Sequence, residues 1–151
     1  MVGSGKPAGA STPGGAEHPD RSVLVQVKAS APDLPPLRVV AADLAARADF
    51  DLDAVADLRL AVDEAASELV AVAVPEAILT CVFFLDATQM EVTASVPARA
   101  GATLRHDSFG WRVLTTLVDE VRVTGEPGAD PPILGITLCK RRSVTTLAQL
   151  R

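Results

Sequence analysis

The hydrophobic residues of one long stretch, 51–74, recur with the period of an α-helix. They stand three and four positions apart, at Val55, Leu58, Val62, Ala65, Leu69 and Val72. This spacing aligns them on one stripe, and burying each of the large ones stabilises a fold by about 1.5 to 3 kcal/mol before the entropic cost is subtracted. Asp51 is placed to cap the helix and Pro75 to end it. The stretch is predicted to be a core helix.

Helical spacing occurs twice more. Residues 35–47 carry it at Leu37, Val40, Ala41 and Leu44, with Asp33 as a possible cap. A third helix is expected from Ser108 onward, with Asp107 or Ser108 as its cap. Its apolar positions are Gly110, Val113, Leu114, Leu117, Val118 and Val121.

Strands are predicted where the pattern alternates with period two or forms a short apolar run between turn residues. These segments are 22–29, 77–85, 90–96, 121–124 and 133–140. A turn at 86–89 joins the second and third of them as an antiparallel pair, and residues 97–107 have no period and are expected to form a loop.

The order of elements is strand, helix, helix, strand, strand, loop, helix, strand, strand. Strands and helices do not alternate regularly, which argues against a doubly wound parallel sheet. We expect an α+β two-layer sandwich in which three helices cover a mostly antiparallel sheet of about five strands. The 151 residues suit one domain at 21–142, with a disordered Gly- and Pro-rich tail at 1–20 and a C-terminal tail at 143–151.

Composition and charge disfavour nucleic acid as a ligand. The formal charge is −5, and the chain has four Phe, one Trp and no Tyr, so phosphates would be repelled and stacking surfaces are few. The one short basic cluster, residues 140–142, is interpreted as a solvated strand end.

Neither secretion nor a membrane span is expected. Cys81 and Cys139 lie far apart within apolar runs, without the spacing of a zinc site, and are predicted to be buried thiols of a cytoplasmic protein. Pro75 and Glu76 interrupt the longest apolar stretch, and no apolar signal-peptide core begins the chain.

The candidate chemistry lies on the polar side of the long helix. Glu64 and Glu68 are four residues apart, beside Asp57 and off the buried stripe. Such a pair can be a solvated face or part of a site. Two other motifs are set aside: Gly3-Ser4-Gly5-Lys6 lacks a preceding strand and the spacing of a phosphate loop, and His106-Asp107-Ser108 has no nucleophile elbow.

The order of elements and three motifs resemble the anti-sigma factor serine kinases of the GHKL (histidine-kinase-like) ATPase superfamily, over most of residues 22–142. The segment DLRLAVDEAASEL is similar to the N-box, and DSFGWRVLTTLVDEV is similar to the glycine motif that opens the helix after the nucleotide lid. LGITL is close to the last strand motif.

The resemblance implies a histidine-kinase-like ATPase (Bergerat) fold and roles for particular residues. Glu64 matches the general base, and Arg38 matches an arginine of the first helix that grips protein partners. Gly110, Gly135 and Thr137 match nucleotide-binding positions, with ATP and Mg²⁺ as the implied cofactors and no metal ligand set of the protein's own. Each glycine, and Thr137, also has a packing interpretation.

The motifs depart from the family where they would hold nucleotide. Glu68 replaces the N-box asparagine that holds Mg²⁺, which places a carboxylate next to triphosphate. The segment SVPARAG stands where an Asp-x-Gly-x-Gly would recognise adenine, and Ser108-Phe109-Gly110 stands for a Gly-x-Gly.

The resemblance with these departures predicts an anti-sigma factor of a stress-response transcription system. It would bind and inhibit an alternative sigma factor, would be countered by an anti-anti-sigma protein, and would form a homodimer, with kinase activity weak or lost. The alternative is an active ATP-dependent serine kinase that phosphorylates the anti-anti-sigma partner, with Glu64 as base and Glu68 assisting Mg²⁺.

Overall fold

A computed structural model describes residues 20–143 of the chain. The predicted tails at 1–20 and 143–151 lie outside these residues except for Asp20 and Ser143. The helices are α1 (Pro35–Arg47), α2 (Leu52–Val72) and α3 (Phe109–Leu117), with a short 3-10 turn at Ala31–Asp33. The strands are β1 (Arg21–Lys28), β2 (Ile78–Leu85), β3 (Gln89–Pro97), β4 (Glu120–Glu126) and β5 (Ile133–Arg141).

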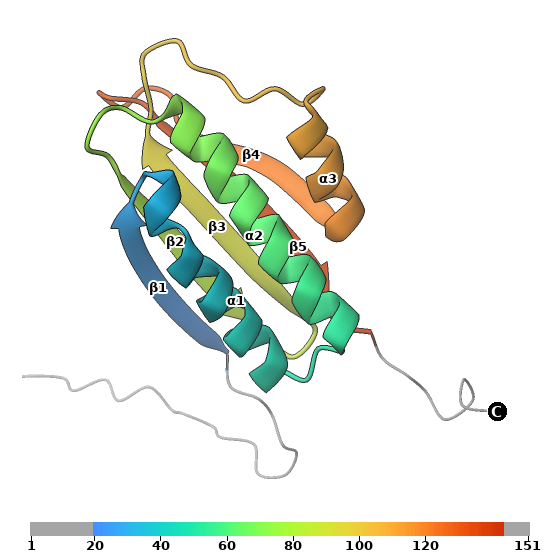
Figure 1. Ribbon diagram of the computed structural model, residues 1–151. Coiled ribbons are helices and arrows are strands. Elements are labelled where there is room, and N and C mark those ends of the chain that lie inside the picture. Colours follow the sequence, from blue (N-terminus) through green and yellow to red (C-terminus); the bar gives the residue numbers. More distant parts are fainter. Residues whose placement is uncertain (1–19, 144–151) are drawn as a thin grey trace, which may run out of the picture.

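The strands form a single antiparallel sheet in the order β1-β2-β3-β5-β4. All three helices lie on one face of this sheet, with α2 running across its middle between α1 and α3 (Figure 1). The predicted two-layer sandwich of five strands and three helices is therefore confirmed.

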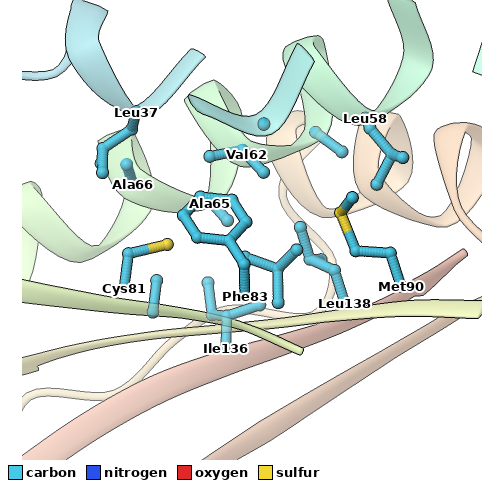
Figure 2. Packing of buried hydrophobic residues seen from close by; sticks show 14 of the residues in the cluster. Leu37, Leu58, Val62, Ala65, Ala66, Cys81, Phe83, Met90, Ile136 and Leu138 are labelled. Atoms are coloured by element: carbon cyan, nitrogen blue, oxygen red, sulfur yellow. The ribbon is translucent and has the colours of Figure 1, made fainter. Parts of the chain in front are cut away.

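The core lies between the helices and the sheet. Its helix side comes from the predicted stripe of α2, and its sheet side from alternate residues of β2, β3 and β5, among them Phe83, Val92 and Leu138. Figure 2 shows the ring of Phe83 beneath Val62 and Ala65 of α2. Residues of the strands are buried at alternate positions, because helices cover one face of the sheet and not the other (Figure 1).

The ends of α2 and α3 have the expected caps. Asp51 Oδ1 accepts a hydrogen bond from the Ala54 amide at 2.8 Å, and Ser108 Oγ accepts one from the Trp111 amide at 3.0 Å. The sequence suggested Asp33 as a cap of α1, and this is wrong. The carboxylate of Asp33 accepts a hydrogen bond from the Ser30 hydroxyl within the preceding turn, and Leu34 is the N-cap.

The third helix is shorter than its apolar pattern suggested. It ends at Leu117, Val118 is its C-cap, and Val121 belongs to β4, where it pairs with Leu138. Hydrogen bonding to β5 satisfies the backbone of this segment, so pairing between strands prevails over a local helical pattern.

Candidate functional site

The acidic pair of α2 faces the beginning of α3. Glu64 and Glu68 lie one turn apart and are both partly buried. Burial raises the pKa of Glu64, and the charge of Glu68, a hydrogen bond with the Glu68 side chain and the charge of Asp63 raise it further. Glu64 therefore keeps its proton to a higher pH than an ordinary glutamate does.

Gly110 of α3 packs directly against these two carboxyl groups. A Cβ built on Gly110 would collide with Oε1 of Glu64 and Oε1 of Glu68. The glycine is buried, so the close-packing interpretation of this residue is correct in the structure. Whether it also serves phosphate approach is a separate question of fit.

The acidic pair and Gly110 form a crowded, negatively charged contact between α2 and α3. An ionised carboxylate here would repel any phosphate brought beside it. Within residues 20–143, no group of three or more His, Cys, Asp and Glu side chains is arranged to hold a metal ion.

The loop before α3 is held by contacts among its own residues. Arg105 binds both carboxylate oxygens of Asp107 at 3.1 Å, and this ion pair lowers the pKa of Asp107. The ring of His106 stacks on Trp111 with 4.4 Å between centroids. Ser108 Oγ donates to the Arg105 carbonyl in addition to capping α3. These local contacts explain the His-Asp-Ser run without hydrolytic chemistry.

Gly135 and Thr137 lie on the opposite face of the sheet from the acidic pair. Their neighbours Ile136 and Leu138 point into the core under the helices, so strand alternation turns Gly135 and Thr137 away from it. Thr137 Oγ1 lies 2.9 Å from Thr93 Oγ1. The structure therefore does not bring these two residues together with Glu64, Glu68 and Gly110.

The position of Gly135 is explained by packing. A Cβ there would lie 2.6 Å from Thr124 Oγ1 and 3.0 Å from the Ala94 carbonyl oxygen. Thr137 is only 3% exposed although the helices do not cover it. The ion pair of Arg122 and Glu91, 3.7 Å apart on the strands that flank β5, lies on the same face.

Arg38 lies beside the acidic side of α2. Its Nε atom is 3.7 Å from Asp63 Oδ1, and both side chains are partly exposed. The first helix thus places an arginine within ion-pair distance of the residue that precedes Glu64. The side chain remains accessible to another molecule.

The interpretation of residues 140–142 as a solvated strand end is wrong for two of the three. Lys140 Nζ donates to the Leu117 carbonyl at 2.8 Å and lies 3.3 Å from Asp57 Oδ2, so it connects β5 to α3 and α2. Arg142 donates to the Ala48 carbonyl at 2.9 Å. The missed signal is period two: Lys140 continues the inward positions Ile136 and Leu138.

No helix in the described part of the chain is both long and apolar enough to cross a membrane.

Cys81 and Cys139 are free, and burial raises the pKa of the Cys81 thiol to about 12. Both thiols are buried, as expected from the sequence.

The fold and the site define a class: an α+β sandwich whose central helix presents a glutamate pair to α3 and whose first helix presents an accessible arginine. The chain is 37% identical over 130 residues to the anti-sigma-F factor RsbW of Mycobacterium tuberculosis, strains CDC 1551 / Oshkosh and H37Rv, which covers 83% of this chain and 77% of each relative. No protein-family model matches it. The chain belongs to the anti-sigma-F factor family, and the resemblance to anti-sigma factors is confirmed.

Proposed function

We propose that this protein is a cytoplasmic anti-sigma factor that binds an alternative sigma factor and prevents it from directing transcription. The observation that carries the proposal is the identity of 37% over 83% of the chain with proteins named anti-sigma-F factor. The accessible Arg38 on α1 supports it, because an exposed guanidinium is a common anchor at protein interfaces.

The binding test uses purified components. Each alternative sigma factor of the source bacterium is mixed with the full chain, and complexes are detected by calorimetry. A sigma factor that binds is then tested in run-off transcription with core RNA polymerase. Binding together with loss of transcripts is the expected result, whereas binding to none of the sigma factors would refute the proposal.

Kinase activity is proposed to be weak or lost. Gly110 packs against the carboxyl groups of Glu64 and Glu68, and Glu68 adds a negative charge where triphosphate would lie. The alternative, an active serine kinase, is favoured by one observation: the raised pKa of Glu64 suits a general base. ATP and Mg²⁺ would then be cofactors, which the contact at Gly110 opposes.

One measurement separates the two. Mg-ATP is titrated while thermal unfolding is followed, and a ligand at about 100 times its dissociation constant adds about 2.7 kcal/mol to the free energy of unfolding. We expect no shift at millimolar ATP. A clear shift, with phosphate transfer to an anti-anti-sigma protein that Glu64→Ala abolishes, would establish the kinase instead.

The protein is proposed to act as a homodimer. An anti-anti-sigma protein is proposed to release it from the sigma factor. β1 is an edge strand of the sheet, and three large apolar side chains, Leu24, Ile78 and Phe84, are exposed on the helix-free face of β1 and β2. Both features favour association of two sheets. Sedimentation equilibrium tests the dimer, and a monomer at all concentrations would contradict it.

A further inference from the structure

A groove runs between α1 and α2 on the side of the helices away from the sheet. It has a volume of about 480 Å³. The residues that line it are Pro35, Arg38, Val39, Ala42, Arg59 and Leu60. Because α1 and α2 lie side by side over the sheet (Figure 1), the groove faces solvent and can be reached by another molecule.

The floor of the groove is apolar but exposed. Val39 is 67% exposed and Leu60 is 52% exposed, although both belong to well-formed helices. Leu60 is not part of the stripe that packs on the sheet, because the buried residues of α2 include its neighbours Leu58 and Ala61 but not Leu60 itself. These two side chains gain nothing from the core and would gain from burial against a partner.

The apolar row on α2 continues beyond the groove. Leu52, Ala56 and Leu60 repeat every four residues, all three are exposed, and Leu52 is 86% exposed. At 1.5 Å per residue the row is about 12 Å long, which corresponds to about two turns of a second helix. An amphipathic helix laid along such a row matches it with apolar residues at four-residue spacing.

The charges beside the groove are paired with one exception. Arg38 is paired with Asp63 at 3.7 Å, and Arg47, farther along α1, with Asp43 at 2.8 Å. Arg59 has no ion pair within the described residues 20–143. One guanidinium is therefore left over in a protein whose total charge is −5, and it would bind a carboxylate.

We infer that this groove, with Arg59, Val39 and Leu60 as its contact residues, seats an acidic amphipathic helix of the sigma factor. The inference rests on the proposed function and extends the partner surface from Arg38 on α1 to α2. Val39 and Leu60 bury the apolar side of the partner helix, and Arg59 binds a carboxylate on its flank.

The test measures the affinity of the full chain for the sigma factor found by the transcription assay. Arg59→Glu is expected to weaken binding about tenfold or more, and so is the pair Val39→Gln with Leu60→Gln. Arg59→Lys keeps the charge and should lose less than Arg59→Glu. Arg112→Glu is the matched control, since Arg112 is exposed on α3, away from the groove, and undergoes the same charge change. Circular dichroism and melting confirm that each variant is folded.

The outcomes separate the two proposals. If the wild-type chain binds no sigma factor, the proposed function fails. If it binds and both groove variants bind equally well, the function stands and the groove inference is overturned. If the groove variants disrupt self-association in sedimentation runs but keep sigma affinity, the groove seats a second copy, which also overturns it.

Discussion

Gly110 at the start of α3 packs against the carboxyl end of Glu68 on α2, and a side chain at position 110 would have to push that carboxyl group aside. Glu64 meets the same glycine from one turn earlier in α2. Glu68, which replaces the asparagine that holds Mg²⁺ in the family, is thus part of the seam, the contact surface between α2 and α3. This contact supports the proposal that kinase activity is weak or lost.

Gly110→Ala tests the seam. The added methyl group would meet both carboxyl groups, which are the ends of flexible side chains and must move aside. We therefore expect a cost at the low end of the about 1 to 3 kcal/mol for overpacking, part of which the better helix propensity of alanine offsets. Urea unfolding should show a net loss of stability. Gly128→Ala is the control, because nothing lies within 4 Å of a Cβ there. Adding Glu68→Ala to Gly110→Ala should recover much of the loss, and no recovery would argue against the contact.

Glu64→Gln tests the raised pKa of Glu64. The pKa of Glu64 is raised in the folded state, so the folded protein holds a proton that the unfolded chain releases, and wild-type stability falls as pH rises from the ordinary glutamate value, about 4.3, through the raised pKa. Glutamine removes this loss. The variant should be more stable than wild type at neutral pH, and the difference should vanish below about pH 4.

The measurement for Glu64→Gln is urea unfolding at a series of pH values. Glu126→Gln, at an exposed glutamate at the end of β4, is the matched control and should follow the wild-type curve. If the Glu64→Gln difference stays constant with pH, the pKa of Glu64 is not raised in the folded protein and the interpretation of the pair fails.

Lys140→Met tests the connection between β5 and the two helices α2 and α3. The substitution leaves the Leu117 carbonyl and the Asp57 carboxylate without their donor. Both acceptors are only partly buried, so we expect a loss at the low end of the about 1 to 3 kcal/mol that an unsatisfied buried acceptor costs. The next residue provides the control: Arg141 is exposed, and Arg141→Met should change stability by no more than about 0.5 kcal/mol. Equal small effects at both positions would mean that Lys140 is effectively solvated.

Arg38→Glu tests the partner surface on α1. It should weaken sigma-factor binding without lowering the melting temperature much, because an exposed ion pair at 3.7 Å contributes only about 0 to 1 kcal/mol. Calorimetry with the sigma factor measures the first effect, thermal unfolding the second, and Arg112→Glu again controls for total charge. Unchanged affinity would remove Arg38 from the interface.

Most elements could be predicted because their patterns are local. The helix at 35–47 has the predicted bounds, and Asp51 and Ser108 cap as expected. The end of α3 was predicted too far along the chain, because Val118 and Val121 also fit the helical stripe; the strand predicted at 121–124 is confirmed as part of β4. Val121 pairs with Leu138 of β5, so hydrogen bonding between the strands takes this residue out of the helix.

The candidate site was only partly predictable for a related reason. The spacing of Glu64 and Glu68 placed them on one side of α2, which the structure confirms. The resemblance grouped Gly135 and Thr137 with them, whereas strand alternation places these two on the far face of the sheet. Their nucleotide role remains a prediction that the geometry does not support.

By itself the sequence determined the periodic elements, the buried stripe of α2, the acidic pair and the resemblance to anti-sigma factors, since these follow from residue type and spacing along the backbone. Only the tertiary structure decided that Gly110 closes on the pair, that Lys140 points inward to Leu117 and Asp57, and that Val39 and Leu60 remain in solvent beside Arg59. These relationships join residues far apart in the chain, and the packing of helices against one another and against the sheet sets them.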